Sequence, residues 1–260
     1  MDLAALWVQL GVAAAIIVGA SLQLTKSADV IAIKTGLGRS FAGIVLLATA
    51  TSLPELGTGV SSVAWVGEPD MAVGSAFGSS LFNLLIIGLL DVLWWNRYLL
   101  NHVGMSSVVV GTLGVGIISI TSIAVMLHGM TTSFATWYLS PLSLLAIGLF
   151  GAAMFFIYNY EKKQDSNSSN DGGDDYANKR LSVGLLVYIS SAAIVVGGAI
   201  WLSVVGEQLA TELGWGASFM GTQFLAAVTS LPEVVTSIAA LRLNAPEMAV
   251  TNLLGSNLFN

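Results

Sequence analysis

The residues best suited to chemistry are Glu55 and Glu233, because each ends the same five-residue word, Thr-Ser-Leu-Pro-Glu, in the middle of a long apolar stretch. The two words begin at Thr51 and Thr229. A carboxylate near the centre of a membrane span is energetically costly, and a proline beside it removes a backbone donor and disrupts the helix. Finding both features twice indicates an internal duplication built around a buried ion site.

Oxygen-bearing residues accompany each glutamate. Four positions in each half are spaced i, i+3, i+4 and i+7, which stacks them on one helical face: Ala48, Thr51, Ser52 and Glu55, and then Ala226, Thr229, Ser230 and Glu233. A second repeated word, GSSLFN and then GSNLFN, adds hydroxyl and amide oxygens at Ser79, Asn83, Ser256 and Asn260. Carboxylate, hydroxyl, amide and backbone oxygens together form a hard ligand set suited to Ca²⁺ or Na⁺.

The prolines predict a break in both helices. Pro54 and Pro232 have no N–H, so the carbonyls of Ala50 and Val228 lose their partners within the helix. Irregular backbone of this kind is tolerated in a membrane where it lines a cavity. We therefore expect two broken helices at the ion site.

Composition places the chain in a membrane. Hydrophobic residues make up 55% of the 260 positions and charged residues only 9%, whereas soluble domains carry roughly 25% charged residues. Cysteine is absent, which excludes disulfides, thiolate metal sites and cysteine nucleophiles. The segment Met1 to Leu3 has no basic residue ahead of its apolar run, so residues 4–24 are expected to be a retained span rather than a cleaved signal peptide.

Apolar segments long enough to cross a bilayer recur along the chain. We predict spans at 4–24, 40–66, 70–93, 105–127, 137–159, 181–205 and 216–241, and an eighth that starts near Pro246. The eighth would cover only about 22 Å of the roughly 30 Å hydrocarbon core before Asn260. We therefore expect the natural protein to continue with the rest of this span and about two more.

Basic residues indicate the orientation. With the N-terminus outside, every Lys and Arg falls on the cytoplasmic side: Lys26, Lys34, Arg39, Arg97, Lys162, Lys163, Lys179, Arg180 and Arg242. The two glutamate words then run in opposite directions through a plasma (inner) membrane. The prediction is an all-α polytopic bundle with two inverted-topology repeats, in which 1–160 is the first repeat, 161–180 a cytoplasmic linker, and 181–260 an incomplete second repeat.

In these repeated words the chain resembles the cation/calcium antiporter superfamily, in particular its prokaryotic sodium/calcium exchangers. The resemblance implies ten spans and a site in which Ca²⁺ and Na⁺ share Glu55 and Glu233. It implies surrounding ligands from Thr51, Ser52, Thr229, Ser230, the carbonyls of Ala48 and Ala226, and the side chains of Ser79, Ser256, Asn83 and Asn260. Some members have aspartate where this chain has Asn83 or Asn260, which leaves stoichiometry and potassium dependence open.

The predicted function is secondary antiport of Ca²⁺ against Na⁺, by alternating access around the glutamate pair. Antiport driven by H⁺ or dependent on K⁺ is an alternative on the same fold, and a cation channel is a weaker one. We expect no enzyme activity, because there is no GxSxG elbow and neither His102 nor His128 lies at the depth of the motif. We expect no cofactor and no nucleic-acid partner, and function as a monomer, once complete, in the lipid bilayer.

Overall fold

The structure is a computed structural model that describes residues 2–35, 48–94, 99, 104–130, 141–165, 180–242 and 246–260. Over these residues it is helical and contains no strand. The elements are α1 (Leu3–Thr35), α3 (Ala48–Thr51), α4 (Leu53–Ser61), η2 (Ser62–Val66), α5 (Pro69–Leu93), α6 (Met105–Met130), α7 (Pro141–Asp165), α8 (Leu181–Leu213), α9 (Ala217–Phe219), η5 (Met220–Leu225), α10 (Ala226–Thr229), α11 (Leu231–Arg242) and α12 (Pro246–Phe259).

Five helical segments among the described residues are long and apolar enough to cross a bilayer: Leu3–Ala28, Pro69–Leu93, Ser107–Leu127, Leu181–Leu213 and Ala217–Arg242. They correspond to five of the predicted spans. Of the other predicted spans, 40–66 is described from Ala48 onward, 137–159 contains the shorter apolar helix Ser143–Ile157, and the last corresponds to α12. The predicted linker 161–180 lies mostly outside the described residues. The chain is thus an all-α polytopic membrane protein.

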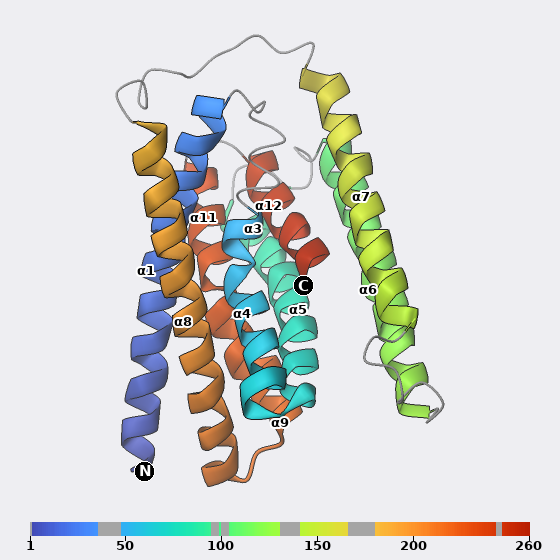
Figure 1. Cartoon of the computed structure of the whole chain (residues 1–260). Coiled ribbons are helices and arrows are strands. Elements are labelled where there is room, and N and C mark those ends of the chain that lie inside the picture. The colour runs from blue at the N-terminus through green and yellow to red at the C-terminus, as the bar shows by residue number, and fades with distance from the viewer. Residues whose placement is uncertain are drawn as a thin grey trace.

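Helices α1 and α8 form a long antiparallel pair at one edge of the bundle (Figure 1). Both are longer than the predicted spans 4–24 and 181–205, because residues beyond the apolar core still pack against protein. Val30 of α1 contacts Gly184 of α8, where an added Cβ would lie 3.0 Å from the valine Cγ1. Leu209 of α8 is fully buried in the same cluster as Leu6. Helix α8 ends at Leu213 and is followed by Gly214, whose φ of +66° suits a glycine C-cap.

The broken helices lie in the middle of the bundle, between the α1–α8 pair and the α6–α7 pair (Figure 1). Helix α4 packs against α8 and α5, and α12 packs against α5, α6 and α11. Segments from the two sequence halves therefore alternate in space rather than forming two separate packing units. The predicted linker 161–180 thus divides the sequence into two repeats but does not separate two packed bodies.

Small residues permit the closest helix contacts at the centre. A Cβ added to Gly74 would lie 2.6 Å from the carbonyl oxygen of Ser218, and one added to Gly78 would lie 2.5 Å from that of Thr222. Helix α5 therefore touches the backbone of α9 and η5 directly. Such contacts are expected in membranes, where helix association depends on close van der Waals packing rather than on the hydrophobic effect.

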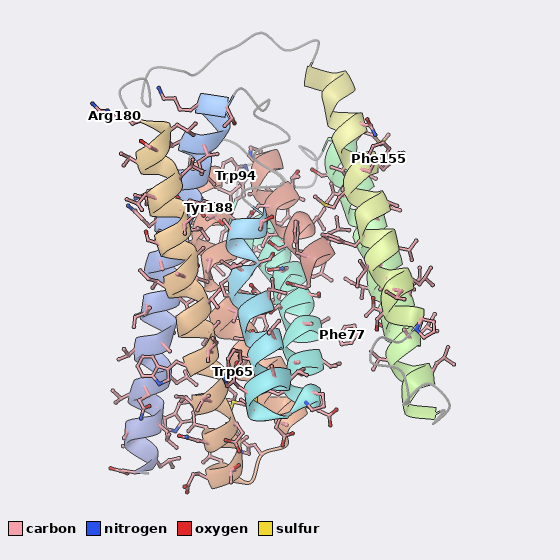
Figure 2. The ribbon with its side chains drawn as sticks, in the orientation of Figure 1. Trp65, Phe77, Trp94, Phe155, Arg180 and Tyr188 are labelled. Carbon is pink, nitrogen blue, oxygen red and sulfur yellow. The ribbon has the colours of Figure 1, made fainter. Side chains whose placement is uncertain are left out.

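Large apolar side chains cover the outer surface. Trp65, Phe155 and Leu186 are 68%, 68% and 69% exposed, and Figure 2 shows Phe155 on α7 at the edge of the bundle. Other large apolar side chains are exposed along most of the described helices, so this surface suits contact with lipid. Arg180 lies at one end of the bundle in Figure 2, and Trp65 lies toward the opposite end.

Candidate cation-binding site

The predicted helix breaks occur in the Thr-Ser-Leu-Pro-Glu words. Helix α3 ends at Thr51 and α4 begins at Leu53, while α10 ends at Thr229 and α11 begins at Leu231. The residues between them, Ser52 and Ser230, have nearly identical backbone angles: φ −87° and ψ 2°, and φ −84° and ψ 1°. The proline therefore has the same local consequence in both halves, and this prediction is confirmed.

Both glutamates are buried at these breaks. Glu55 is 7% exposed and Glu233 is fully buried, and each belongs to the first turn of the helix that follows its break. The segments that carry them meet, because α10, which ends just before the second break, packs against α4, which begins just after the first. The structure thus brings together the two breaks, which lie in separate halves of the sequence.

One carboxyl oxygen of Glu233 accepts a hydrogen bond from a serine of α12. The Ser256 hydroxyl of α12 donates to its Oε1 at 3.2 Å, and the Thr51 Oγ1 lies 3.3 Å from the Ser256 Oγ. The other carboxyl oxygen, Oε2, is buried without a hydrogen-bond partner. The environment of Glu233 therefore includes Thr51 from the first half and Ser256 from the second.

Threonine and serine side chains also lie near Glu55. The side chains of Thr229 and Ser230 lie beside its carboxyl group, yet neither Oε1 nor Oε2 has a hydrogen-bond partner of good geometry. The Ser79 hydroxyl of α5 is 3.3 Å from Thr229 Oγ1, as Ser256 is from Thr51. Each threonine of one half thus meets a serine of the other half's second word.

Unpaired polar atoms are concentrated at these residues. In the described part of the chain, thirteen buried side-chain nitrogen and oxygen atoms have no hydrogen-bond partner, and eight of them belong to predicted ligands. They are Ser52 Oγ, both carboxyl oxygens of Glu55, Asn83 Oδ1, Ser230 Oγ, Glu233 Oε2, and the side-chain oxygen and nitrogen of Asn260. Seven of the eight are oxygens, which can bind a positive partner, and leaving buried polar groups of this kind unpaired is costly.

The remaining predicted ligands are differently placed. Ala226 is fully buried, but its carbonyl already accepts bonds from the Ser230 N–H at 3.0 Å and the Thr229 hydroxyl at 3.3 Å. Ala48 begins α3, and its side chain lies outside the described residues. Asn260 is only partly buried. The carbonyl ligands implied by the resemblance thus stay a prediction.

Sequence reasoning missed Asn257. Its side chain accepts a hydrogen bond from the Asn83 amide nitrogen at 2.8 Å and donates one to the carbonyl oxygen of Ser80 at 3.3 Å. The available signal was the one difference between the two repeated words, GSSLFN and GSNLFN, which places Asn257 where the first half has Ser80.

The chemistry of the site fits an alkali or alkaline-earth cation. No group of three or more His, Cys, Asp or Glu side chains able to hold a metal occurs within the described ranges. Two carboxylates surrounded by hydroxyl and amide oxygens resemble the oxygen cages of Ca²⁺ and Na⁺, and lack the nitrogen or sulfur ligands of zinc and copper sites.

Broken helices in the middle of a polytopic membrane bundle are typical of secondary transporters. The family described as sodium/calcium exchanger protein matches residues 5–167 and 183–260, and the chain belongs to this family. As members of a transporter family, such proteins move ions across a membrane rather than transform a substrate chemically.

Curated relatives are distant. The chain is 29% identical over 246 residues to the inner membrane protein YrbG of Escherichia coli K12, covering 92% of this chain and 71% of YrbG. It is 24% identical over 217 residues to the uncharacterized membrane protein MJ0091 of Methanocaldococcus jannaschii, covering 83% of this chain and 65% of that protein. Sodium/potassium/calcium exchanger 1 of Mus musculus is 32% identical over 72 residues, covering 25% of this chain and 6% of the mouse protein. No solved structure matches the chain significantly.

Proposed function

We propose that the protein exchanges Ca²⁺ for Na⁺ across the membrane, with both ions using the site around Glu55 and Glu233. The observation that carries this proposal is the concentration of unpaired buried oxygens on these two carboxyl groups and on the residues beside them. Membership of the sodium/calcium exchanger family supports transport of calcium in general. The choice of Na⁺ as the driving ion and the role of the pair are our inference.

Electrostatics supplies the coupling. Two ionised carboxylates at close range repel each other strongly where water is excluded, so the empty site is unfavourable and a bound cation relieves the repulsion. Ca²⁺ and Na⁺ would require the same oxygens and therefore bind in alternation. If only the occupied forms change between outward and inward exposure, the two fluxes are linked.

We infer further that the two halves form an inverted repeat. The matching backbone angles at Ser52 and Ser230 support this relation. In Figure 1, α4 runs from α3 toward the end of the bundle where α9 lies, whereas α11 runs away from that end. The distribution of Lys and Arg supports an outside N-terminus. Alternating access would follow from exchange of conformations between the two similar halves.

Calcium uptake into proteoliposomes that contain the full chain tests the driving ion. We expect an outward sodium gradient to drive ⁴⁵Ca²⁺ uptake, and an outward proton gradient in sodium-free buffer to drive little. Uptake with the proton gradient alone would favour H⁺ exchange. Calcium flux without any counter-ion gradient, dissipating with its own concentration difference, would favour a channel and contradict the proposal.

Potassium dependence is the second candidate, favoured by the similarity to the mouse sodium/potassium/calcium exchanger over 72 residues. The same proteoliposomes test this dependence, with K⁺ or an impermeant organic cation added on the calcium side. Sodium-driven uptake that proceeds equally in both buffers would exclude an obligatory potassium ion.

A further inference from the structure

Two successive hydrogen bonds determine the orientation of the Asn83 side-chain amide. In the first, the backbone carbonyl of Ser80 accepts from Asn257 Nδ2 at 3.3 Å. Asn257 Oδ1 in turn accepts one from Asn83 Nδ2 at 2.8 Å. Asn257 is 6% exposed and Asn83 is 1% exposed, so water offers little competition for these bonds.

The donor and acceptor of each of these hydrogen bonds follow from the groups involved. A backbone carbonyl can only accept a hydrogen bond, so the Asn257 amide must turn its NH₂ group toward Ser80. Its oxygen then faces Asn83, so the NH₂ group of Asn83 must point toward this oxygen as the donor. The ambiguity between nitrogen and oxygen that normally affects asparagine side chains is therefore resolved at both residues by one carbonyl group.

The result is an unpaired oxygen on Asn83. With Nδ2 committed to Asn257, Oδ1 is left buried with no hydrogen-bond donor. If the Asn83 amide were turned over, its oxygen would face the oxygen of Asn257, and the NH₂ group would take the place of the free acceptor. An NH₂ group repels a cation, whereas a carbonyl oxygen is a good ligand for one.

We propose that Asn257 is a positioning residue, which holds the Asn83 amide so that its oxygen is presented to the cation. This role rests on the proposed function. Asn260, which corresponds to Asn83 in the second half, is not held in this way. Ser80, which corresponds to Asn257, donates its hydroxyl instead to the carbonyl of Ala76 at 3.1 Å. Accordingly neither Asn260 Nδ2 nor Asn260 Oδ1 has a partner. The two asparagines of the repeated word are thus held differently.

Asn83→Asp separates positioning from a purely structural role. A carboxylate presents an oxygen whichever way it turns, so an aspartate at this position needs no partner to orient it. Asn257→Leu, of similar volume, removes both hydrogen bonds. In the otherwise unmutated chain we expect Asn257→Leu to weaken Ca²⁺ binding about tenfold, and in the Asn83→Asp background by less than about twofold.

Isothermal titration with Ca²⁺ on the purified full chain in detergent measures this double-mutant cycle, and does not require transport. Equal losses in the two backgrounds would overturn the positioning role, as would loss of all Ca²⁺ binding in Asn83→Asp. Failure of the unmutated protein to bind Ca²⁺ would instead contradict the proposed function itself. These outcomes are distinguishable in one set of titrations.

Asn252→Leu is the matched control. Asn252 lies on the same helix, is 8% exposed, and donates to Thr236 Oγ1 at 3.1 Å and to Ser237 Oγ at 3.5 Å, neither of which is a predicted ligand. We expect this change to shift Ca²⁺ affinity by the same factor with and without Asn83→Asp. A loss that Asn83→Asp rescued here too would show that the rescue is not specific to Asn257, and would overturn the proposal.

Discussion

The hydroxyl oxygens of Thr51 and Ser256 lie 3.3 Å apart, although the residues are separated by 205 positions in the sequence. The same distance joins Ser79 and Thr229, separated by 150 positions. Each threonine precedes a glutamate of its own half and meets a serine from the other half. The two halves therefore depend on each other at the proposed site, and neither provides the full set of oxygens alone.

Ser256→Ala should weaken Ca²⁺ binding, because the Ser256 hydroxyl donates the hydrogen bond to Glu233 Oε1 and is itself a proposed ligand. We expect a loss of about tenfold, since hydrogen bonds to charged groups contribute about 1.5–3 kcal/mol. Titration calorimetry with Ca²⁺ measures it.

Ser203→Ala is the control for this change, because Ser203 is fully buried and its Oγ lies 2.6 Å from the Ser61 hydroxyl, between α8 and α4. Its Ca²⁺ affinity should stay within about twofold of the unmutated value, as expected for a hydroxyl that contacts no proposed ligand. Similar losses in the two variants would argue that Ser256 acts through general packing.

Gly78→Ala should destabilise the bundle. The new methyl group would lie 2.5 Å from the Thr222 carbonyl oxygen and 2.7 Å from the Ala226 Cβ, so α5 would have to move away from η5 and α10. Overpacking of this kind costs about 1–3 kcal/mol. Thermal unfolding in detergent, followed by light scattering or intrinsic fluorescence, would show a lower midpoint.

Gly88→Ala, on the same helix, is the matched control. No atom lies within 4 Å of an added Cβ at Gly88, and alanine is favoured over glycine in a helix by about 1 kcal/mol. We expect an unchanged or slightly higher midpoint. Equal destabilisation by the two alanines would contradict the close contact at Gly78.

Cysteine labelling tests the orientation against a clean background, because the chain has no cysteine. We expect Ser168→Cys to react with a membrane-impermeant maleimide only from the cytoplasmic side, and Asp70→Cys only from outside. Asp70 is exposed, whereas the nearby Gly67 is a poor position for a cysteine because its φ of +81° disfavours any side chain. Reaction of both cysteines from one side would contradict the proposed topology.

The sequence predicted the breaks well, because a proline acts locally and removes a specific backbone hydrogen bond. Ser52 and Ser230 therefore adopt nearly the same angles. The π-helical turns η2 and η5 were not predicted. An extra residue in a helical turn leaves no periodic signal, and its position depends on packing such as that of Gly221 against the Met71 carbonyl.

The contact of Asn257 with Asn83 was also not predicted from the sequence. The repeated words align Asn257 with Ser80, and from spacing alone this position varies between the halves without an evident purpose. Only the packing of α12 against α5 brings Asn257 to Asn83, 174 positions away. Contacts between distant segments of this kind are set by the tertiary fold, whereas helix periodicity reports only on neighbours along the chain.

The central claim is that Glu55 and Glu233 jointly bind the exchanged ions. Sodium-driven ⁴⁵Ca²⁺ uptake in proteoliposomes tests it most directly, with Glu55→Gln and Glu233→Gln compared with Glu212→Gln, which changes an exposed glutamate at the end of α8. Either buried substitution should lower uptake at least about a hundredfold, because a neutral amide would replace one of the two carboxylates that balance the charge of Ca²⁺. Both variants should still insert normally, because the substitution removes a charge from the membrane interior, and Glu212→Gln should transport like the unmutated protein. Near-normal uptake by Glu55→Gln or Glu233→Gln would contradict the shared site.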